Sequence, residues 1–248
     1  MRTDDLVKRR IEIKHLVSPA AAGELRDRIG RARPGRNARR LCGWVTTTYF
    51  DLPDRRLARA ALDRPEQNLK LRAREYFSEE GIPTSPFLWI EIKEREGGVS
   101  RKSRFQLHRR LLRRFLEGER DLAEILTCQE KGCALEDVVA AVQRIDDLAR
   151  SPLLTVGSVR CRRSSVQGGD PAARITLDES ISYHLGRPSE RGSLAPAAWV
   201  EPAAIIEIKH VGDAVPDWAA ELAGPLEPSD YSKFLVLARL SLGEADAA

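Results

Sequence analysis

The tetrapeptide Ile-Glu-Ile-Lys occurs three times in this 248-residue chain, at Ile11–Lys14, Ile90–Lys93 and Ile206–Lys209. Successive side chains of an extended strand point to opposite faces, so the two isoleucines of each copy share one face while Glu and Lys share the other. Residues two apart do not share a helical face, and β-branched residues favour strands. The repeat therefore predicts three strands, each presenting a carboxylate beside an ammonium.

Further stretches alternate in the same way with a stronger basic bias. The basic side chains that share a strand face are Lys70, Arg72 and Arg74 in one stretch, Lys102 and Arg104 in a second, and Arg174 in a third. Two arrangements account for such faces. One is the solvated face of an open antiparallel sheet. The other is a closed barrel whose charged faces line the interior while its apolar faces meet helices outside.

A cationic barrel interior with a few carboxylates suits one class of ligand. Arginine and lysine neutralise phosphate oxygens, and glutamate supplies the hard oxygen ligands that Mg²⁺ or Mn²⁺ prefers. The second arrangement therefore favours a polyphosphate ligand together with its divalent metal.

Length, repeat spacing and charge limit the architecture and the partners. The three tetrapeptides lie near the start, the middle and the end of the chain, so a sheet that uses all of them makes residues 1–248 a single domain. Their unequal spacing argues against a solenoid. With 41 basic against 37 acidic residues, the net charge of +4 is too small to indicate a nucleic-acid binder.

The compartment follows from what the chain lacks. No apolar stretch at its start is long enough for a signal peptide, and no window approaches the ~18 apolar residues that span a bilayer. We expect a cytoplasmic protein with no membrane segment, which leaves room for a membrane partner protein. The cysteines are expected to be reduced thiols, because none forms a Cys-x-x-Cys pair: Cys42, Cys128, Cys133 and Cys161. His15 and His210 fall on the isoleucine face, which indicates packing or a surface position.

Periodicity and turn residues order the remaining elements. Helices are predicted at Ala20–Ile29, Leu135–Leu148, Ala214–Leu222 and Tyr231–Leu242, with a further helical stretch from Arg109. Besides the three tetrapeptides, strands are predicted at Gly43–Asp51, Leu69–Phe77, Phe87–Glu94, Arg101–Leu107, Leu153–Arg163 and Arg174–Ile181. Turns are expected at Gly97-Gly98 and at Gly168-Gly169-Asp170-Pro171. Ser18 is predicted to cap the first helix, and Ser229 or Asp230 the last.

The chain carries, in order, Arg10-x-Glu12-x-Lys14, Tyr49-Phe50-Asp51-x-Pro53, Leu71-Arg72-x-Arg74-x-Tyr76, Ile90-Glu91-Ile92-Lys93, Arg174-Ile175-Thr176-Leu177-Asp178, Ile206-Glu207-Ile208-Lys209 and Tyr231-Ser232-Lys233-Phe234. No single motif is specific, but this order over nearly the whole chain resembles the VTC domain. That is the polyphosphate polymerase domain of the vacuolar transporter chaperone family, within the CYTH-like superfamily of triphosphate tunnel metalloenzymes.

The resemblance implies an α+β fold, an antiparallel eight-stranded β-barrel tunnel with charged walls and helices packed outside. Known members bind nucleoside triphosphate or polyphosphate with Mn²⁺ or Mg²⁺. The resemblance therefore implies ATP and inorganic polyphosphate or triphosphate as ligands. Three activities stay open: a polymerase that transfers the ATP γ-phosphoryl group to a growing polyphosphate chain, a metal-dependent tripolyphosphate or nucleoside triphosphate hydrolase, and a non-catalytic polyphosphate or nucleotide binder.

The resemblance also implies roles for individual residues. Those implied to hold phosphates are Lys14, Arg72, Arg74, Lys93, Arg163, Arg174, Lys209, Ser232 and Lys233, and the strand faces add Lys70 and Arg104. Glu207 is implied as the metal ligand. Glu12 and Glu91 are either further metal ligands or salt-bridge partners that keep neighbouring Arg and Lys side chains extended.

Three positions depart from relatives. Arg10 stands where the hydrolase branch has the first Glu of Glu-x-Glu-x-Lys, which favours the VTC branch. Eukaryotic polymerases carry a basic residue where this chain has Asp230, and an aromatic residue where it has Cys161.

Overall fold

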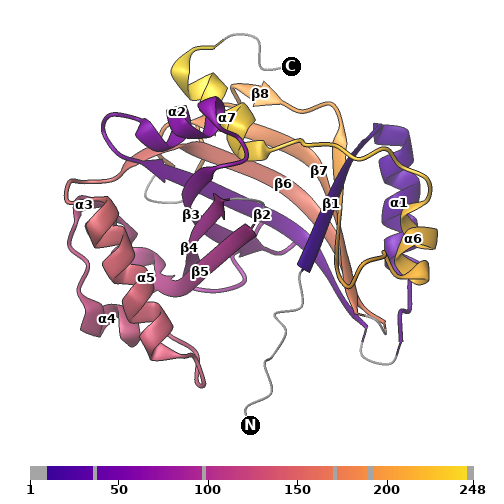
Figure 1. The fold of residues 1–248 in the computed structure, drawn as a ribbon, viewed down its shortest axis with the longest axis horizontal. Coiled ribbons are helices and arrows are strands. Elements are labelled where there is room, and N and C mark those ends of the chain that lie inside the picture. Colours follow the sequence, from indigo (N-terminus) through magenta and orange to yellow (C-terminus); the bar gives the residue numbers. More distant parts are fainter. Residues whose placement is uncertain (1–9, 36–37, 97–98, 170–171, 189–192, 245–248) are drawn as a thin grey trace. The chain divides into compact units, whose positions relative to one another are not determined.

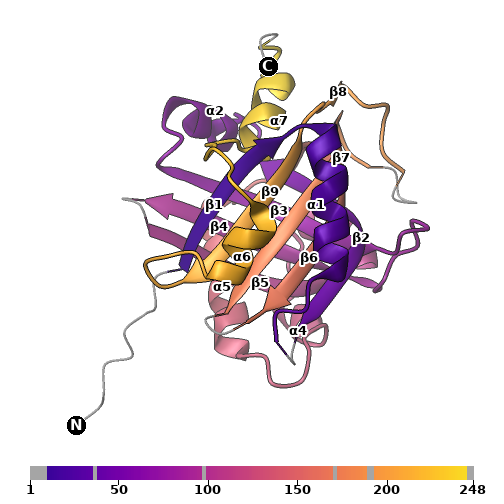
Figure 2. The same ribbon diagram turned by 90° about the vertical axis from the view of Figure 1, so that its right-hand side faces the viewer.

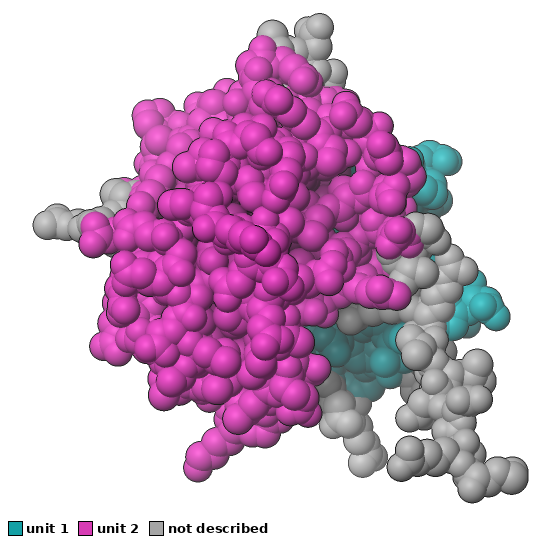
Figure 3. Space-filling model, turned by 60° about the vertical axis from the view of Figure 1, so that its left-hand side comes forward, with its two compact units in different colours: residues 1–44, 161–181, 201–231 teal, residues 45–160, 182–200, 232–248 magenta. Residues whose placement is uncertain are grey.

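The computed structural model describes residues 10–35, 38–96, 99–169, 172–188 and 193–244. The chain divides into two compact units, coloured separately in Figure 3. Unit 1 comprises Met1–Trp44, Cys161–Ile181 and Glu201–Tyr231, and unit 2 comprises Val45–Arg160, Ser182–Val200 and Ser232–Ala248. Each unit therefore combines segments that lie far apart in the sequence.

The strands belong to one nine-stranded sheet. Their bounds are β1 (Arg10–Val17), β2 (Arg39–Asp51), β3 (Asn68–Phe77), β4 (Phe87–Glu96), β5 (Val99–His108), β6 (Leu154–Gly168), β7 (Ala173–Leu185), β8 (Trp199–Val200) and β9 (Ala204–Val211). Hydrogen-bonded neighbours follow the order β1-β9-β7-β6-β2-β3-β4-β5, with β8 paired to β7. The pairs of β9 with β1 and β7, of β4 with β3 and β5, and of β7 with β8 are antiparallel. The predicted α+β class with an antiparallel sheet is confirmed.

Seven α-helices lie in the described ranges. They are α1 (Pro19–Arg31), α2 (Arg56–Asp63), α3 (Leu112–Glu117), α4 (Leu122–Leu126), α5 (Leu135–Leu148), α6 (Asp217–Ala223) and α7 (Lys233–Leu242), and a 3-10 turn (Arg109–Leu111) precedes α3. The predicted bounds of α5 agree with the structure at both ends. Among these helices, none combines the length and the apolar character needed to cross a bilayer.

In unit 1, two helices cover the isoleucine face of the sheet. Ile208 of β9 lies in register between Ile13 of β1 and Ile175 of β7. Helices α1 and α6 lie side by side across this region (Figure 2). Leu25 of α1 and Leu222 of α6 belong to the same buried cluster as Ile208 and Ile175. The alternation expected of the first and third tetrapeptides is therefore confirmed, because Glu and Lys take the opposite face.

In unit 2, the hairpin of β3 and β4 continues into β5, and α3, α4 and α5 gather beside these strands (Figure 1). Leu71, Ile90 and Phe105, one from each strand, are fully buried. They join a cluster that includes Phe115 of α3 and Ile145 of α5. Helices therefore cover the apolar face of this part of the sheet, which leaves the charged face on its other side.

Asp51, from the Tyr-Phe-Asp motif, holds the start of α2. Its side chain is fully buried, and its carboxylate oxygens accept hydrogen bonds from the backbone N–H groups of Leu52, Leu57 and Ala58 at 2.7, 3.0 and 2.9 Å. Burial raises the pKa of Asp51 against the opposing effect of these N–H groups. A carboxylate at a helix N-terminus satisfies orphan N–H groups and interacts favourably with the helix dipole. The motif thus has a structural role here.

The predicted cap of the last helix is wrong. The N-cap of α7 is Ser232 and not Ser229 or Asp230. Ser229 is engaged elsewhere, because its N–H donates to the carbonyl of Lys14 at 2.8 Å and its hydroxyl accepts from the N–H of Tyr231 at 3.2 Å. The helix therefore begins later than the sequence pattern indicates.

Two further expectations differ in detail. The helical stretch predicted from Arg109 is interrupted after α3 by Gly118, whose φ of 100° ends the helix in the left-handed region. The turn at residues 97–98 and the second half of the turn at 168–171 lie outside the described residues.

Candidate functional site

The charged face of β3, β4 and β5 in unit 2 is a grid of nine side chains, which we call the cationic face. The strand registers define three rows across it, Lys70–Lys93–Lys102, Arg72–Glu91–Arg104 and Arg74–Trp89–Gln106. Facing residues in neighbouring strands have Cβ atoms about 5 Å apart. Every position except Glu91, Trp89 and Gln106 therefore adds a cation to a small area.

Glu91 is the carboxylate at the centre of the cationic face, and its side chain is 1% exposed. Its Oε2 accepts a hydrogen bond from Arg72 Nε at 2.8 Å, and lies 2.7 Å from Arg72 Nη2 and 3.9 Å from Arg74 Nη1. Its Oε1 lies 2.5 Å from Lys102 Nζ. One buried carboxylate thus orients cations from both neighbouring strands.

These contacts shift the pKa values of Glu91 and Lys102. Burial raises the pKa of Glu91, but Arg72, Arg74 and Lys102 outweigh burial and bring it to about 2. Burial lowers the pKa of Lys102 to about 8, although Glu91 raises it in part. Burying an ammonium disfavours its charged form, and the nearby guanidinium groups act in the same direction. Lys102 therefore changes charge closer to neutral pH than an ordinary lysine does.

The lysine row lies beside the start of α7. Lys70 Nζ donates to Ser232 Oγ at 3.3 Å and lies 5.4 Å from the centroid of the Phe234 ring. Like charges directly opposite each other in a sheet are destabilising. The exposed N–H groups of a helix N-terminus attract anions. The lysine row and the start of α7 therefore present an arrangement that an anionic ligand would stabilise.

A second charged face lies on β1, β9 and β7 in unit 1. Its rows are Glu12–Lys209–Arg174 and Lys14–Glu207–Thr176. Lys209 Nζ lies 2.7 Å from Glu12 Oε2 and forms an ion pair with Glu207. Lys14 Nζ lies 3.4 Å from Glu12 Oε1 and donates to the carbonyl of Tyr231. This face holds carboxylates and cations in nearly equal number, unlike the cationic face of unit 2.

Glu207 is mostly buried in this arrangement. Burial raises its pKa and so does Glu12, but Lys209 and Arg163 lower it, with a net decrease below the ordinary value. Glu207 is therefore ionised at neutral pH, which is the state that a metal ligand requires.

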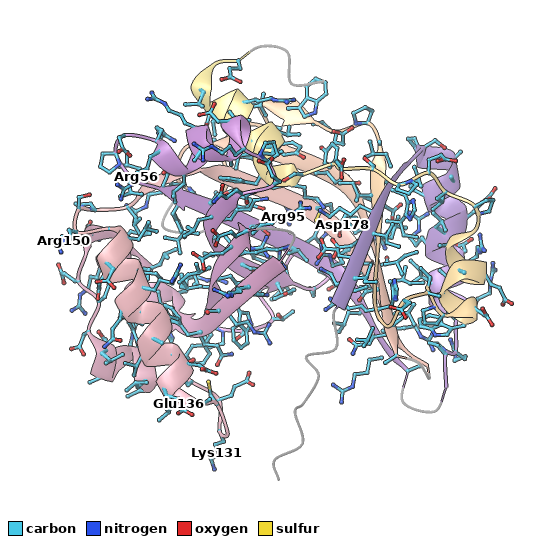
Figure 4. The ribbon with its side chains drawn as sticks, viewed as in Figure 1. Arg56, Arg95, Lys131, Glu136, Arg150 and Asp178 are labelled. Atoms are coloured by element: carbon cyan, nitrogen blue, oxygen red, sulfur yellow. The ribbon has the colours of Figure 1, made fainter. Side chains whose placement is uncertain are left out.

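Arg163 on β6 forms a two-point ion pair in unit 1. Its Nε and Nη2 donate to the two carboxylate oxygens of Asp178 at 2.6 and 2.7 Å, and Asp178 is labelled on β7 in Figure 4. The Asp178 side chain is 4% exposed and that of Arg163 is 15% exposed. Burial lowers the pKa of Arg163, but Asp178 raises it well above its ordinary value. Asp178 thus fixes the guanidinium in a single orientation.

The carboxylates differ in their fitness as metal ligands. Glu12 and Glu207 converge on one cationic centre, Lys209 Nζ. Mg²⁺ is commonly bound through one or two carboxylates plus substrate phosphates and waters, so this pair fits a divalent cation. Glu91 pairs with two arginines and a lysine and is 1% exposed, which fits the salt-bridge alternative. Glu12 and Glu207 also pair with lysines, but their side chains are 26% and 16% exposed and so are more accessible to a metal ion. In the described part of the chain, no cluster of three or more His, Cys, Asp or Glu side chains is arranged around a metal position.

The residues singled out from the sequence fall into two sets. Unit 1 holds Glu12, Lys14, Arg163, Arg174, Glu207 and Lys209, and unit 2 holds Lys70, Arg72, Arg74, Glu91, Lys93, Arg104, Ser232 and Lys233. That both sets line one cavity stays a prediction. Lys102 lies on a strand face that the alternation predicts, but none of the motifs that carry the resemblance includes it. Trp89 directly precedes the repeated tetrapeptide and belongs to no motif.

Of the two positions expected for the isoleucine-face histidines, packing or the surface, the structure shows packing. His15 and His210 are buried, at 7% and 2% exposure, and His15 Nδ1 lies 2.9 Å from the carbonyl oxygen of Glu227. The cysteines are free thiols, as predicted.

Comparison with known protein families identifies one family for this chain. A family model described as the VTC domain matches residues 9–239. No curated protein matches the sequence. Among solved structures, a candidate adenylate cyclase from Bacillus halodurans is 17% identical, with 82% of this chain and 81% of that chain covered and a TM-score of 0.47. A conserved hypothetical protein from Pyrococcus furiosus is 12% identical, with 91% and 98% covered and a TM-score of 0.41. At such identities these matches carry no information on substrate or reaction.

Proposed function

Since this chain belongs to the VTC-domain family, we propose that it is a polyphosphate polymerase. It binds ATP through its triphosphate and transfers the γ-phosphoryl group to an inorganic polyphosphate chain. Residues 1–248 act as one catalytic domain in this proposal, with Mn²⁺ or Mg²⁺ as cofactor and the cytoplasm as the site of action.

The observation that carries the proposal is the lysine row of the cationic face. Lys70, Lys93 and Lys102 face one another across three strands, and Arg72 and Arg104 form the next row. A protein gains no stability from placing like charges opposite each other. A ligand with several adjacent negative charges offsets that repulsion, and a triphosphate or polyphosphate chain has this chemistry.

Phosphoryl transfer depends on alignment and on cations at the developing negative charge, and needs little covalent chemistry from the protein. Arg72, held by the buried Glu91, is already oriented before a ligand arrives. Lys70 and Lys93 neutralise the terminal phosphates, and Lys14 and Lys209 hold phosphates of donor or product. In this proposal no serine or cysteine acts as a nucleophile.

The divalent cation neutralises phosphate oxygens when it is bound. Glu12 and Glu207 are the residues proposed to hold it, because their carboxylates already meet at one cationic position. Lys209 balances the two carboxylates in the absence of the metal. We keep Glu91 as the residue that orients Arg72, Arg74 and Lys102.

Incubation of the purified protein with ATP and Mn²⁺ tests the proposal, with the products separated into long-chain polyphosphate, free phosphate and ADP. We expect polyphosphate and ADP in the wild type. The matched pair Lys102→Ala and Arg101→Ala removes the same charge from adjacent residues of β5, and only Lys102 lies on the cationic face. Chain synthesis should fall in Lys102→Ala and persist in Arg101→Ala. Free phosphate as the only product would replace the polymerase with a hydrolase, and ATP binding without turnover would indicate a binder.

A further inference from the structure

The cationic face of unit 2 changes character along its strands. Its first row holds only lysines, its second two arginines beside a glutamate, and its third Arg74, Trp89 and Gln106. Phe87 and His108 form the next facing pair, with ring centroids 5.4 Å apart. Successive rows are two residues apart, roughly 7 Å along a strand. The face therefore runs from a cationic end to an aromatic end.

Trp89 is the aromatic side chain within the grid. The guanidinium carbon of Arg104 lies 4.3 Å from the centroid of its ring, a cation–π contact between β4 and β5. Arg104 itself is exposed. An exposed cation–π contact contributes little stability, so another flat group could replace the guanidinium on the ring at small cost.

The polar neighbour of Trp89 on β5 is held by hydrogen bonds. Gln106, which faces Trp89 across the strands, is 7% exposed, and its Nε2 donates to Glu130 Oε1 at 3.0 Å. The backbone N–H and C=O of Gln106 are both bonded to the side-chain amide of Gln129, at 3.0 and 2.8 Å. The ring thus stands beside a polar group that is fixed in place.

We propose that Trp89 is the platform on which the nucleobase of the donor stacks, in the position that Arg104 occupies here. This inference rests on the proposed function, which assigns the phosphates to the same face. The base takes the ring face of Trp89, and Arg104 turns toward the phosphates. The site then selects a nucleoside triphosphate over inorganic triphosphate as donor.

Stacking on Trp89 would fix the orientation of the nucleoside triphosphate along the strands. With the base on Trp89, the triphosphate follows the strands through the row of Arg72 and Arg104. The γ-phosphoryl group then lies at the lysine row beside Ser232, at the cationic end of the face. The acceptor phosphate approaches from that end.

A positioning role for Trp89 makes a different prediction. If the ring only holds Arg104 in place, its loss weakens every ligand that Arg104 contacts, with or without a base. Comparison of ATP with inorganic tripolyphosphate therefore separates the two roles.

The test measures the dissociation constants of ATP and inorganic tripolyphosphate, each with Mg²⁺, by isothermal titration calorimetry. Base–aromatic stacking in single-strand binding corresponds to roughly 5- to 150-fold in affinity. We expect Trp89→Leu to weaken ATP binding within that range while tripolyphosphate binding changes less than about twofold. Trp89→Phe should recover most of the ATP affinity, because a flat ring remains.

Phe77→Leu is the matched control. Phe77 also carries a guanidinium near its ring, that of Arg160 at 5.4 Å, but it lies at the end of β3 on the opposite face from Arg74. Both affinities should be unchanged in this variant. Melting temperatures of all variants identify any loss that comes from folding.

Each outcome decides the inference. Equal ATP affinity in wild type and Trp89→Leu overturns the platform and leaves the proposed function intact. An equal loss of both ligands in Trp89→Leu, at unchanged melting temperature, replaces the platform with a positioning role. A wild type that binds neither ligand overturns the proposed function and the platform together.

Discussion

Lys102 Nζ lies 2.5 Å from Oε1 of Glu91, the buried carboxylate whose other oxygen pairs with the guanidinium of Arg72. Glu91 therefore connects the cations of β3 and β5 through β4. A buried charge that loses its partner is strongly destabilising. Glu91 accordingly offsets part of the repulsion among the cations of this face.

Glu91→Gln should lower the free energy of unfolding by about 3–5 kcal/mol, because it leaves partly buried cations without their counter-charge. Added tripolyphosphate should raise the melting temperature of this variant more than that of the wild type. Glu94→Gln, the same change three residues further along β4 at a residue paired with Arg144, is the control. An unchanged melting temperature with loss of metal-dependent activity would instead make Glu91 a metal ligand.

The change in folding stability at acid pH tests the Glu91 carboxylate as well. The pKa of Glu91 is about 2 in the folded protein and 4.5 ordinarily, so its contribution is present above pH 4.5 and is lost as the pH falls toward 2. We expect the stability difference between wild type and Glu91→Gln to shrink over this range. Urea unfolding at a series of acid pH values measures it, and a constant difference would contradict the assignment.

The lowered pKa of Lys102 predicts that the affinity for triphosphate decreases at alkaline pH. With its pKa lowered to about 8, Lys102 is charged at pH 7 and mostly neutral at pH 9. A ligand that binds only the charged form loses about tenfold in affinity between those values. Lys102→Arg keeps its charge throughout and should remove this dependence. Calorimetric titration with tripolyphosphate at both pH values decides it, and identical profiles for the two proteins would contradict the role of Lys102.

Asp178→Asn should destabilise unit 1 by about 3–5 kcal/mol, because Arg163 would remain largely buried without a counter-charge. The double variant Asp178→Asn/Arg163→Met should recover part of the loss, since both charges are then removed. Urea unfolding measures each variant. A cost below about 1 kcal/mol for the single variant would show that solvent reaches the pair, as in a surface ion pair.

Glu207→Gln should abolish divalent-dependent turnover with little change in melting temperature, because we assign its carboxylate to the metal and not to packing. Mn²⁺ binding in the presence of tripolyphosphate, followed by electron paramagnetic resonance, should weaken in parallel. Glu201→Gln, which alters a carboxylate bonded to the Tyr231 hydroxyl, is the control. If Glu207 only balances Lys209, the variant keeps its metal-dependent turnover while its melting temperature falls.

The sequence predicted which side chains share a face, because alternation is a local property. Ile90–Lys93 fixed the buried and charged faces of β4, and Leu71 and Phe105 extended the same assignment to its neighbours. It could not predict which residues face each other. Lys102 stands opposite Lys93 and not opposite Glu91 because of the register of two strands, which no single strand encodes.

Tertiary contacts and local backbone geometry account for the remaining differences. Ser229 has the chemistry of a helix cap, but its N–H is bonded to Lys14, a residue more than two hundred positions away in the chain. Ser180 adopts a φ of 50° within β7, a backbone conformation that favours glycine or asparagine. Because the residue is a serine, the sequence does not indicate this local change in the strand. The roles of Glu91 and Trp89 likewise depend on neighbours from other strands.

Lys233→Ala tests the reaction itself. Lys233 is the first residue of α7, next to Ser232, whose hydroxyl accepts a hydrogen bond from Lys70 at 3.3 Å. In a polymerase the chain must be held beyond the transferred phosphoryl group, so loss of this cation should shorten or abolish the polyphosphate product while nucleotide binding persists. Arg239→Ala, near the other end of the same helix, removes an equal charge and should leave chain length unchanged. Chain lengths are resolved by gel electrophoresis after incubation with ATP and Mn²⁺. A wild type that forms only free phosphate from ATP or tripolyphosphate, with no chain longer than its substrate at any metal or primer concentration, would contradict the polymerase and favour the hydrolase.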